Sequence, residues 1–295
     1  MKNGILDEWE YVTERTEKYE EKMNNIIQKP FLRWAGGKTW LLNKLSTHIP
    51  FSYNNYHEPF LGGGSVYFFL NPNNLSFLSD SNDELVNTFI QVKDNIDDLI
   101  KELKEYKNTI DHYYLIREKS YRDKVKRAAR FIFLNRTGFN GIYRVNLKGK
   151  YNVPYGFKDY KYLFDYNLFR SASKCLKATN ISSGDFELTI KNIHERDFVF
   201  IDPPYTVSHI KNGFIKYNEK LFSWEDQERL ANYINQIKEK GAFYVMTNAK
   251  HDTVENLYAQ IETPISINRF SVIGGKYAKR EPIQEFLFTN VKGIK

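Results

Sequence analysis

Residues 199–205, Val-Phe-Ile-Asp-Pro-Pro-Tyr, constrain the fold of this chain more than any other segment. The apolar run at 199–201 is typical of a β-strand buried on both faces, as in the parallel sheet of an α/β fold. Such a strand places Asp202 at its carboxyl end, the edge at which open α/β sheets bind ligands. Pro203 and Pro204 have fixed φ angles and no N–H, so their carbonyl groups can accept hydrogen bonds from a ligand. The segment therefore predicts a binding site at the end of a buried strand.

A ligand with an amino group on a flat ring would fit the four residues Asp202, Pro203, Pro204 and Tyr205. The carboxylate and a proline carbonyl accept the two N–H bonds, Tyr205 stacks on the ring, and the nitrogen lone pair is left directed at a methyl donor. A strand-ending turn whose acid caps a helix is the alternative for Asp-Pro alone. Four such residues after a buried strand favour the ligand site, and we take them as the candidate catalytic residues.

A glycine-rich segment at 58–65, Glu-Pro-Phe-Leu-Gly-Gly-Gly-Ser, follows another short apolar run. Gly62 and Gly64 begin a dinucleotide-binding pattern, but Tyr67 occupies the place of its third glycine. Asp80, 18 residues after Gly62, is positioned to bind ribose hydroxyls. Alone, the loop does not distinguish a nicotinamide cofactor, S-adenosylmethionine or a plain tight turn.

The segment at 30–39 contains Gly-Lys-Thr, yet it is not a P-loop, because Leu32 stands where that motif needs a glycine. Gly36 and Gly37 with Trp34 and Lys38 fit an aromatic and cationic wall for a cofactor that bears a carboxylate. A helix start is the alternative for this segment read alone.

The charge of the chain is unevenly distributed. Residues 1–28 hold seven acidic and four basic residues, so the net charge of +7 becomes +10 over residues 29–295. A basic protein with a pI near 9.1 favours a polyanionic partner, because each neutralised phosphate releases counterions. Cys175 is the only cysteine, which excludes a disulfide framework and a thiolate zinc site, and we expect no metal. No signal peptide or membrane-spanning run is evident, which predicts an intracellular, soluble protein.

The order of predicted elements indicates an α/β sheet domain made from both ends of the chain, with a domain inserted at about 90–180. Residues 7–27 predict an acidic accessory helix. The other predicted elements are strands at 56–60, 75–78, 198–201 and 242–246, helices from about 65 and 83 and at 94–106, 122–135 and 224–239, a β-hairpin at 141–156, and an antiparallel pair at 261–268 and 284–290.

The motifs at 33–38, 58–65 and 202–205, in this order, resemble those of Dam-type N6-adenine DNA methyltransferases (D12 class, group alpha). Further matches are Asn-Gly-Ile-Tyr-Arg-Val-Asn at 140–146 and Tyr-Asn-Val-Pro-Tyr-Gly at 151–156. The resemblance covers residues 29–292. It implies a Rossmann-like S-adenosylmethionine-dependent methyltransferase domain at 29–90 and 181–295, a target-recognition domain of helices plus a β-hairpin at 91–180, and an accessory helix at 1–28.

The resemblance also implies the cofactor, S-adenosyl-L-methionine, and the residues that contact it. Asp80 is expected at the ribose or methionine end, and Asp185 and Phe186 are expected to flank the adenine. The full expected set is Trp34, Lys38, Phe60, Gly62, Asp80, Asp185, Phe186 and Asp202.

For DNA, the resemblance implies contacts from Arg33, Phe139, Asn140, Ile142, Arg144 and Pro154. Arg144, Ile142 and Pro154 are expected at base edges in the major groove, where Arg reads guanine through O6 and N7. Phe139 is expected to wedge into the base stack. A phosphate contact or a surface charge is the alternative for Arg144, and Phe157 departs from an Arg of the family pattern.

These expectations describe an enzyme that flips an adenine out of duplex DNA and methylates its N6, with GATC as the expected target. The alternatives are the same chemistry at another site, on cytosine N4 or on an RNA base, and a sequence-specific DNA-binding protein without catalysis. The expected partners are double-stranded DNA and a cognate restriction endonuclease acting separately, without a membrane. The expected location is cytoplasmic, with the nucleoid.

Overall fold

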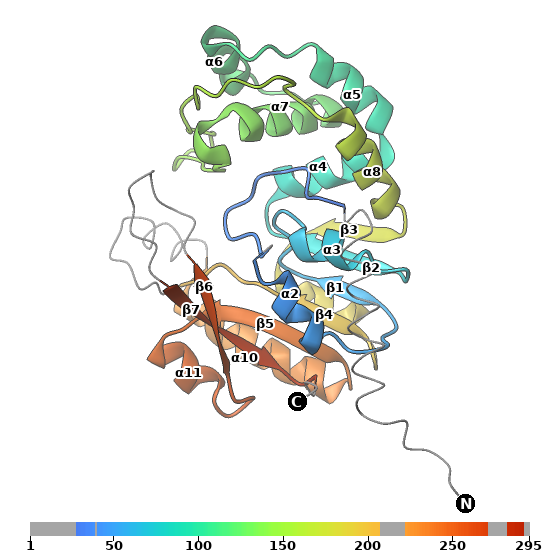
Figure 1. The fold of residues 1–295 in the computed structure, drawn as a ribbon, viewed down its shortest axis with the longest axis vertical. Helices are drawn as coiled ribbons and strands as arrows, with labels where there is room; N and C mark the ends of the chain where they lie inside the picture. Colours follow the sequence, from blue (N-terminus) through green and yellow to red (C-terminus); the bar gives the residue numbers. More distant parts are fainter. Residues whose placement is uncertain (1–27, 39, 207–221, 271–281, 292–295) are drawn as a thin grey trace, which may run out of the picture. The chain divides into compact units, whose positions relative to one another are not determined.

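A computed structural model describes residues 28–38, 40–206, 222–270 and 282–291 (Figure 1). Seven strands form a mixed sheet in the order β3-β2-β1-β4-β5-β7-β6. The chain divides into two compact units: unit 1 includes Trp40–Phe60 and Phe186–Lys295, and unit 2 comprises Ile27–Thr39 and Leu61–Asp185. The predicted helix at 7–27 lies outside the described residues, and the predicted functional boundaries after residues 28, 90 and 180 stay a prediction.

Five strands lie in the described part of unit 1. Parallel strands β1 (Tyr56–Glu58), β4 (Phe198–Ile201) and β5 (Phe243–Ala249) are followed by antiparallel β7 (Pro282–Thr289), which pairs with β6 (Ile265–Phe270). All four residues of β4 are buried, as expected for an apolar strand covered on both faces. The predicted strand at 198–201 and the predicted antiparallel pair are confirmed.

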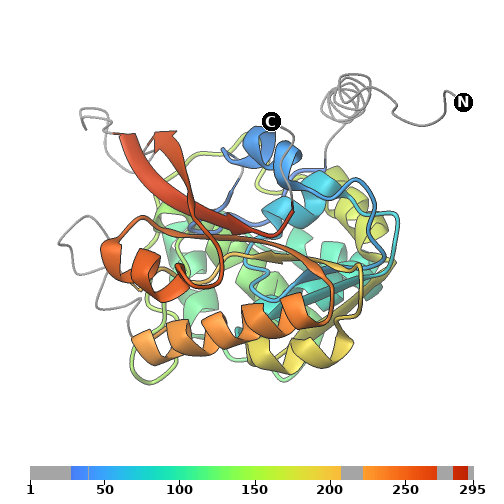
Figure 2. The same cartoon turned by 90° about the horizontal axis from the view of Figure 1, so that it is seen from below.

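Helix α10 (Trp224–Glu239) coincides with the helix predicted at 224–239. It begins with a capping box, in which the Ser223 hydroxyl accepts from the Asp226 N–H and the Asp226 carboxylate accepts from the Ser223 N–H. Figure 2 shows α10 and α11 (Asp252–Tyr258) beside the strands of unit 1, with which they share one apolar core. The smaller elements of this unit are α2 (Leu42–Leu45), η1 (Ser46–His48) and η3 (Phe186–Asn192).

A buried polar pair ties β1 to the start of β4. His57 Nε2 lies 2.9 Å from the carboxylate of Asp197, and both side chains are almost fully buried. Burial opposes ionisation of Asp197, but hydrogen bonds from His57 and from the N–H groups of His194 and Asn55 keep its pKa below the usual value. These contacts fix the two strands whose opposite ends carry the candidate site.

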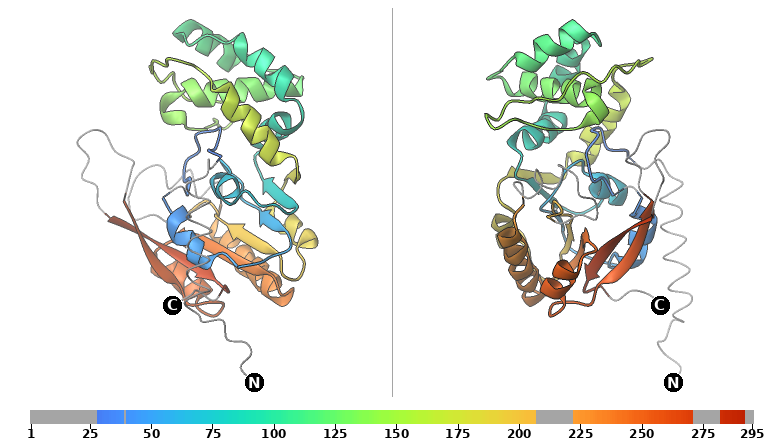
Figure 3. Two further views of the ribbon diagram at one scale, coloured as in Figure 1. Left: turned by 45° about the vertical axis from the view of Figure 1, so that its right-hand side comes forward. Right: turned by 90° about the vertical axis from the view of Figure 1, so that its left-hand side faces the viewer.

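Unit 2 combines two parallel strands with helices. Strand β2 (Ser76–Asp80) pairs with β3 (Thr179–Ser183), and α3 (Ser65–Leu70) follows the glycine-rich loop at the predicted place. Figure 3 shows the remaining helices gathered together: α4 (Asp83–Asp94), α5 (Ile96–Lys104), α6 (Ile110–Glu118), α7 (Lys124–Thr137) and α8 (Tyr166–Leu176). The sequence analysis missed α6, α8 and β3.

The predicted hairpin turn is present, but its arms make only two isolated bridges, Val145–Tyr151 and Gly138–Tyr155, among the residues described here. At the tip, the Asn146 side chain accepts from the N–H groups of Lys148 and Lys150. Such side-chain bonds compete with a regular ladder, because they occupy the backbone groups that a ladder pairs. The segment also contains the short helix η2 (Phe139–Gly141).

Candidate active site

Two parallel strands of unit 1 end beside one another at the switch in strand order. The order runs β3-β2-β1 and then β4-β5, so the direction of winding reverses between β1 and β4. Open α/β sheets bind ligands beyond the carboxyl ends of their strands at such a point. Asp202 directly follows β4, and Phe60 lies two residues after β1. This edge of unit 1 is therefore the expected place for chemistry.

Side chains from two other strands hold the turn at 202–205. Thr247 on β5, fully buried, donates its hydroxyl to Asp202 Oδ1 at 2.8 Å. Tyr205 donates its phenol to Oε2 of Glu285 on β7 at 2.8 Å, and Glu285 is only 2% exposed. Asp202 and Tyr205 themselves remain partly exposed. Both side chains are thus oriented by buried partners.

A buried polar network continues from the next residue, Thr206. The Gln227 amide donates to the Thr206 hydroxyl at 3.1 Å, and that hydroxyl donates to the Phe222 carbonyl at 3.1 Å. The Gln227 carbonyl oxygen accepts from Asn248 at 3.0 Å and from the Tyr258 phenol at 2.9 Å. Satisfied buried networks of this kind are rigid, because every alternative geometry leaves a polar group unpaired.

Burial raises the pKa of the Tyr205 phenol well above its ordinary value, and the negative charges of Asp202 and Glu285 raise it further. The phenol therefore stays protonated across the working pH range. In this state the Tyr205 phenol is a hydrogen-bond donor and not a base.

Unit 1 also brings together two of the predicted cofactor residues. The rings of Phe60 and Phe186 lie 5.2 Å apart between centroids, and Phe222 lies 5.7 Å from Phe60. The Arg229 guanidinium carbon lies 5.1 Å from the Phe186 ring centroid. These aromatic side chains form an apolar surface beside the end of β1, suited to a flat ring.

In unit 2, the glycine-rich loop links the other predicted cofactor residues. The carboxylate of Asp80, at the end of β2, accepts from the Gly62 N–H at 2.9 Å. The carbonyl of Asp80 accepts from the Gly184 N–H, so the residue after Gly184, Asp185, lies near Asp80. Trp34 covers the loop so closely that a Cβ at Gly62 would come within 2.9 Å of its ring. Gly62 also has a φ of +49°, so glycine is required there for two reasons.

Burial raises the pKa of Asp80 above its ordinary value, while hydrogen bonds from the backbone N–H groups of Gly62, Asn82 and Ser81 lower it. A partly exposed carboxylate held by main-chain donors is oriented for a ligand with hydroxyl groups. Lys38 is 2% exposed, and its ammonium donates to the Gly36 carbonyl at 3.1 Å. Its backbone N–H donates to Ser65 at 3.1 Å, which joins the 30–39 segment to the glycine loop.

The predicted DNA-contacting residues lie together around Asn135, a buried side chain on α7. Its amide donates to the carbonyls of Arg33 at 2.7 Å and Gly141 at 3.0 Å, and its oxygen accepts from the Arg33 N–H at 2.9 Å. The Phe139 N–H donates to the Pro154 carbonyl at 2.9 Å. Arg33 is thereby joined to the segment at 138–156, which contains Phe139 and Pro154 and which we name the recognition turn after its predicted role.

The side chains of this turn are exposed. Phe139 is 50% exposed, and Asn140, Arg144 and Pro154 also lie on the surface, whereas Ile142 is partly covered. Asn152 accepts from Arg144 Nε at 2.8 Å, which orients the guanidinium. Phe157, at the position where the family pattern has an Arg, is 73% exposed.

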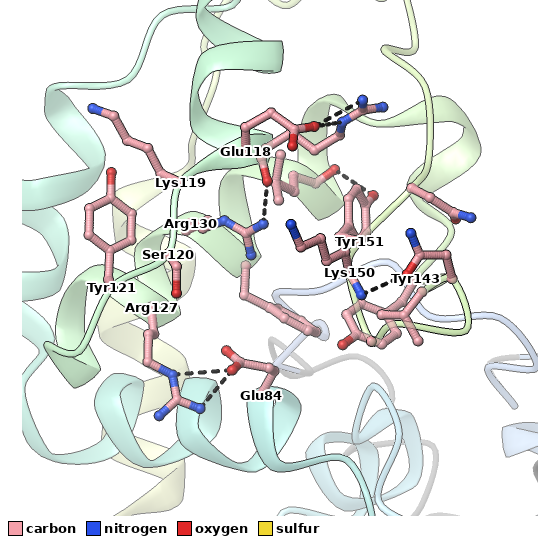
Figure 4. A pocket seen from close by; sticks show the side chains of 17 residues that line it. Glu84, Glu118, Lys119, Ser120, Tyr121, Arg127, Arg130, Tyr143, Lys150 and Tyr151 are labelled. Atoms are coloured by element: carbon pink, nitrogen blue, oxygen red, sulfur yellow. Dashed lines mark hydrogen bonds and ion pairs between the residues drawn. The ribbon is translucent and has the colours of Figure 1, made fainter.

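A cavity of about 380 Å³ lies in unit 2 beside this turn (Figure 4). Tyr143 and Tyr151 line it, and Tyr143 also stacks on Trp34 with the ring centroids 5.7 Å apart. Its cationic lining residues are Arg117, Lys119, Arg127, Arg130 and Lys150. Three of them have structural roles: Arg127 pairs with Glu84, Arg117 pairs with Glu118, and Arg130 donates to carbonyls at the end of α6.

Comparison with known proteins decides the family. The D12 class N6 adenine-specific DNA methyltransferase model matches residues 34–278. The chain belongs to this family. It is therefore an adenine-specific DNA methyltransferase, and the family implies S-adenosylmethionine as the methyl donor. The predicted fold class and enzyme class are confirmed.

Named relatives of this D12-class methyltransferase span most of its length. The type II methyltransferase M1.LlaDCHI of Lactococcus lactis subsp. cremoris is 37% identical over 90% of this chain and 97% of its own. The type II methyltransferase M.MjaIII of Methanocaldococcus jannaschii is 34% identical over 89% and 99%. The DNA adenine methylase of Escherichia coli is 32% identical over 77% and 82%. A solved precorrin-6y C5,15-methyltransferase from Geobacter metallireducens GS-15 superposes with a TM-score of 0.39 at 12% identity over 90% and 98%, a similarity that does not by itself establish a shared fold.

The sequence analysis of this methyltransferase missed the side chains that hold the site. Thr247, Gln227 and Asn135 are ordinary polar residues in the sequence and carry no signal. Glu285 does carry one, because it is a lone acid within an apolar strand run. Among the described residues, no cluster of His, Cys, Asp or Glu has the makings of a metal site, and no helix is long and apolar enough to cross a membrane.

Proposed function

We propose that this methyltransferase flips an adenine out of duplex DNA onto the turn at 202–205 and transfers a methyl group to its N6 within GATC. The observation that carries the proposal is the support of Asp202 and Tyr205 by Thr247 and Glu285. That support gives an acceptor and a flat surface fixed positions at the end of β4, which methylation of an amino group requires.

Asp202 and the Pro203 carbonyl accept the two N6 hydrogens, and Tyr205 stacks on the purine. Neutral N6 is a poor nucleophile, because its lone pair is delocalised into the ring. The two acceptors favour a pyramidal nitrogen and stabilise the positive charge that develops as the N–C bond forms. S-adenosyl-L-methionine, when bound, supplies the methyl group on a sulfonium. The N6 proton then leaves toward the Asp202 side, and no covalent enzyme intermediate is needed.

Base flipping follows from geometry, because N6 inside a stacked duplex cannot align with a methyl donor held at a strand end. Extrusion costs a few kcal/mol, which stacking on Tyr205 partly offsets.

The residues predicted to hold the cofactor have chemistry that fits it. Asp80 supplies a carboxylate for the ribose hydroxyls, and Phe60 with Phe186 supplies apolar ring surface for the adenine. Trp34, Lys38, Gly62, Asp185 and Asp202 complete the proposed set. The ring of Trp34 lies where a side chain at Gly62 would stand, so glycine lets Trp34 pack against the loop.

We assign target recognition to residues 91–180, with Arg33 added from the preceding segment. Arg144 reads a guanine, because Asn152 holds its Nε and so aims the guanidinium fork. Ile142 and Pro154 meet a thymine methyl, and Phe139 with Asn140 fills the space left by the flipped base. This set supports GATC through its resemblance to relatives that recognise that sequence.

Basic residues lining the unit 2 cavity extend the recognition turn with positive charge suited to phosphates. Binding should therefore weaken at least about tenfold between about 50 and 200 mM salt, because phosphate contacts release counterions. Fluorescence anisotropy of a labelled duplex measures this. A flat affinity over that range would contradict a DNA substrate bound through its backbone.

Two alternative functions can be distinguished from the proposed one. The same turn would accept the amino group of cytosine N4 or of an RNA base, whereas a catalytically inactive DNA-binding protein would not need the Thr247 and Glu285 supports. We also propose a cognate restriction endonuclease acting separately, supported by the type II names of two relatives, and a cytoplasmic location with the nucleoid, where the DNA is.

The test is base-resolved sequencing of DNA from cells that express the enzyme. N6-methyladenine confined to GATC is the expected result. Modification of adenine in another sequence would overturn the target and leave the chemistry, whereas N4-methylcytosine or no modified base would overturn the proposed reaction.

A further inference from the structure

Glu285 is an unusual residue for its position on β7. It is 2% exposed, and the three residues that follow it, Phe286, Leu287 and Phe288, are buried and apolar. A carboxylate withdrawn from water among such neighbours is unfavourable unless hydrogen bonds compensate it. Its presence there calls for a specific partner.

One such partner is Tyr205, whose phenol donates to Glu285 Oε2 at 2.8 Å. The two residues are 80 positions apart in the sequence, so the contact exists only in the folded chain. The phenol stays protonated because burial and the nearby carboxylates raise its pKa well above the ordinary value. The bond is therefore a phenol donating to a carboxylate, a strong type of hydrogen bond.

Glu285 and Thr247 also lie on one face of the sheet. Glu285 is the register partner of Ala249 on β5, and Thr247 is two residues from Ala249. Because side chains two apart on a strand point to the same side, Thr247 and Glu285 form a diagonal pair beneath the turn. Thr247 holds the first residue of the turn, Asp202, and Glu285 holds the last, Tyr205.

We infer that Glu285 is a positioning residue for methyl transfer: its carboxylate anchors the tip of the Tyr205 side chain and so sets the plane of the ring on which the flipped base stacks. The inference rests on the proposed function of Tyr205. The Tyr205 hydroxyl interacts with Glu285 and with Thr247, and of the two Glu285 offers the charged acceptor, so loss of Glu285 loosens the ring about its side-chain torsions. Glu285 itself does not touch the base.

The structure suggests three substitutions. Glu285→Ala removes the acceptor, Glu285→Gln keeps an oxygen that accepts the same O–H, and Tyr205→Phe keeps the ring but removes the donor. Gln284→Ala is the matched control, because Gln284 is the neighbouring residue on β7 and its side chain is exposed. Thermal unfolding is measured for every variant.

The expected result is a kcat lowered about 10–100-fold in Glu285→Ala, since small misplacements of reacting groups have effects of that size. The KM for the methyl donor should stay within about twofold, because Glu285 acts on the base side of the reaction. Glu285→Gln should retain most of the kcat, and Gln284→Ala all of it. In Tyr205→Phe, the further change Glu285→Ala should add no loss, because the shared bond is already absent.

A second readout reports the stacking directly. The probe is a duplex with the fluorescent base 2-aminopurine in place of the target adenine. Stacking on the Tyr205 ring is expected to quench the fluorescence of this base. Glu285→Ala should weaken that quenching, and Glu285→Gln should keep it. An unchanged kcat in Glu285→Ala, or equal losses in Glu285→Ala and Glu285→Gln, would overturn the inference, as would independent losses in the double variant. If Glu285→Ala does not fold, Tyr205→Phe is compared with Glu285→Gln. A kcat lowered in Tyr205→Phe alone supports Glu285 as the anchor of the Tyr205 ring. A wild-type kcat in Tyr205→Phe overturns that inference. A wild-type enzyme that transfers no methyl group would instead mark failure of the proposed function.

Discussion

The segment at 202–206, which is the proposed catalytic turn together with Thr206, and the recognition turn at 138–156 are both tied into the fold, but through different atoms. In the catalytic turn, buried partners bond the functional side chains themselves, as Thr247 does for Asp202 and Glu285 for Tyr205. In the recognition turn, the buried side chains mostly bond the backbone: Asn135 donates to the Gly141 carbonyl and Tyr151 to the Ile142 carbonyl.

The side chains of the recognition turn that are proposed to read bases are left exposed as a result. Phe139, Arg144 and Pro154 all lie on the surface, and the one bond to Arg144 comes from Asn152, itself only partly covered. The difference matches the two tasks. Methyl transfer needs reacting groups fixed to a fraction of an ångström, whereas base reading allows side chains to adjust as DNA binds.

The sharpest test of this contrast is Asp202→Ala. Loss of the carboxylate should lower methyl transfer about 10³-fold or more, because it removes a preorganised acceptor of the charge that develops on N6. Affinity for DNA and the unfolding midpoint should change little. Single-turnover transfer of a tritiated methyl group measures the rate, with the exposed Asp252→Ala as the matched control. Substantial residual activity would remove Asp202 from its role as amino-group acceptor.

A smaller effect is expected in the recognition turn. Arg144→Ala should lose about 1–3 kcal/mol of discrimination at one guanine, the range for a bidentate base contact. Competition binding with duplexes altered at single base pairs measures the loss. Lys148→Ala is the control, because this exposed neighbour at the turn tip should weaken binding evenly and reduce the salt slope by about one. An even loss in Arg144→Ala as well would make Arg144 a phosphate contact.

The two segments should also differ, by a smaller amount, in how far one substitution lowers the free energy of unfolding. Thr206→Val removes a buried hydroxyl that accepts from Gln227, and should lower the free energy of unfolding by about 1–3 kcal/mol. Asn146→Ala removes an exposed acceptor at the tip of the recognition turn and should lower it by less than about 1 kcal/mol. Urea denaturation compares them. Equal losses would show that the catalytic turn is not the more tightly determined one.

The least effect is expected from deletion of residues 1–28, which the sequence indicates to be accessory. Activity and the unfolding midpoint should stay close to those of the full chain, as measured by methyl transfer and thermal unfolding. A truncated chain that fails to fold would show that this segment contributes to the core.

The elements predicted best from the sequence are those with local signals. The apolar run before Asp202 became β4, and α10 spans the residues 224–239 predicted for it. The elements missed have weaker signals: β3 is exposed at three of its five positions, and α6 buries only Tyr113 and Ile116 along its length. Alternation at 141–156 predicted a hairpin, and its arms do exchange backbone hydrogen bonds, as from the Asn152 N–H to the Arg144 carbonyl. A regular ladder is missing at the tip, where the Asn146 side chain accepts from the Lys150 N–H.

The sequence alone determined the chemistry that this protein presents: an acid and a tyrosine around two prolines after a buried strand, and a glycine loop followed by Asp80. Such motifs are short, so the covalent chain itself keeps their residues together. The tertiary structure alone decided what orients them. Glu285 meets Tyr205 across 80 residues, and Asn135 meets Arg33 across 102. Contacts at that separation depend on strand register and helix packing, which no local pattern specifies, because they form only when the whole core is buried.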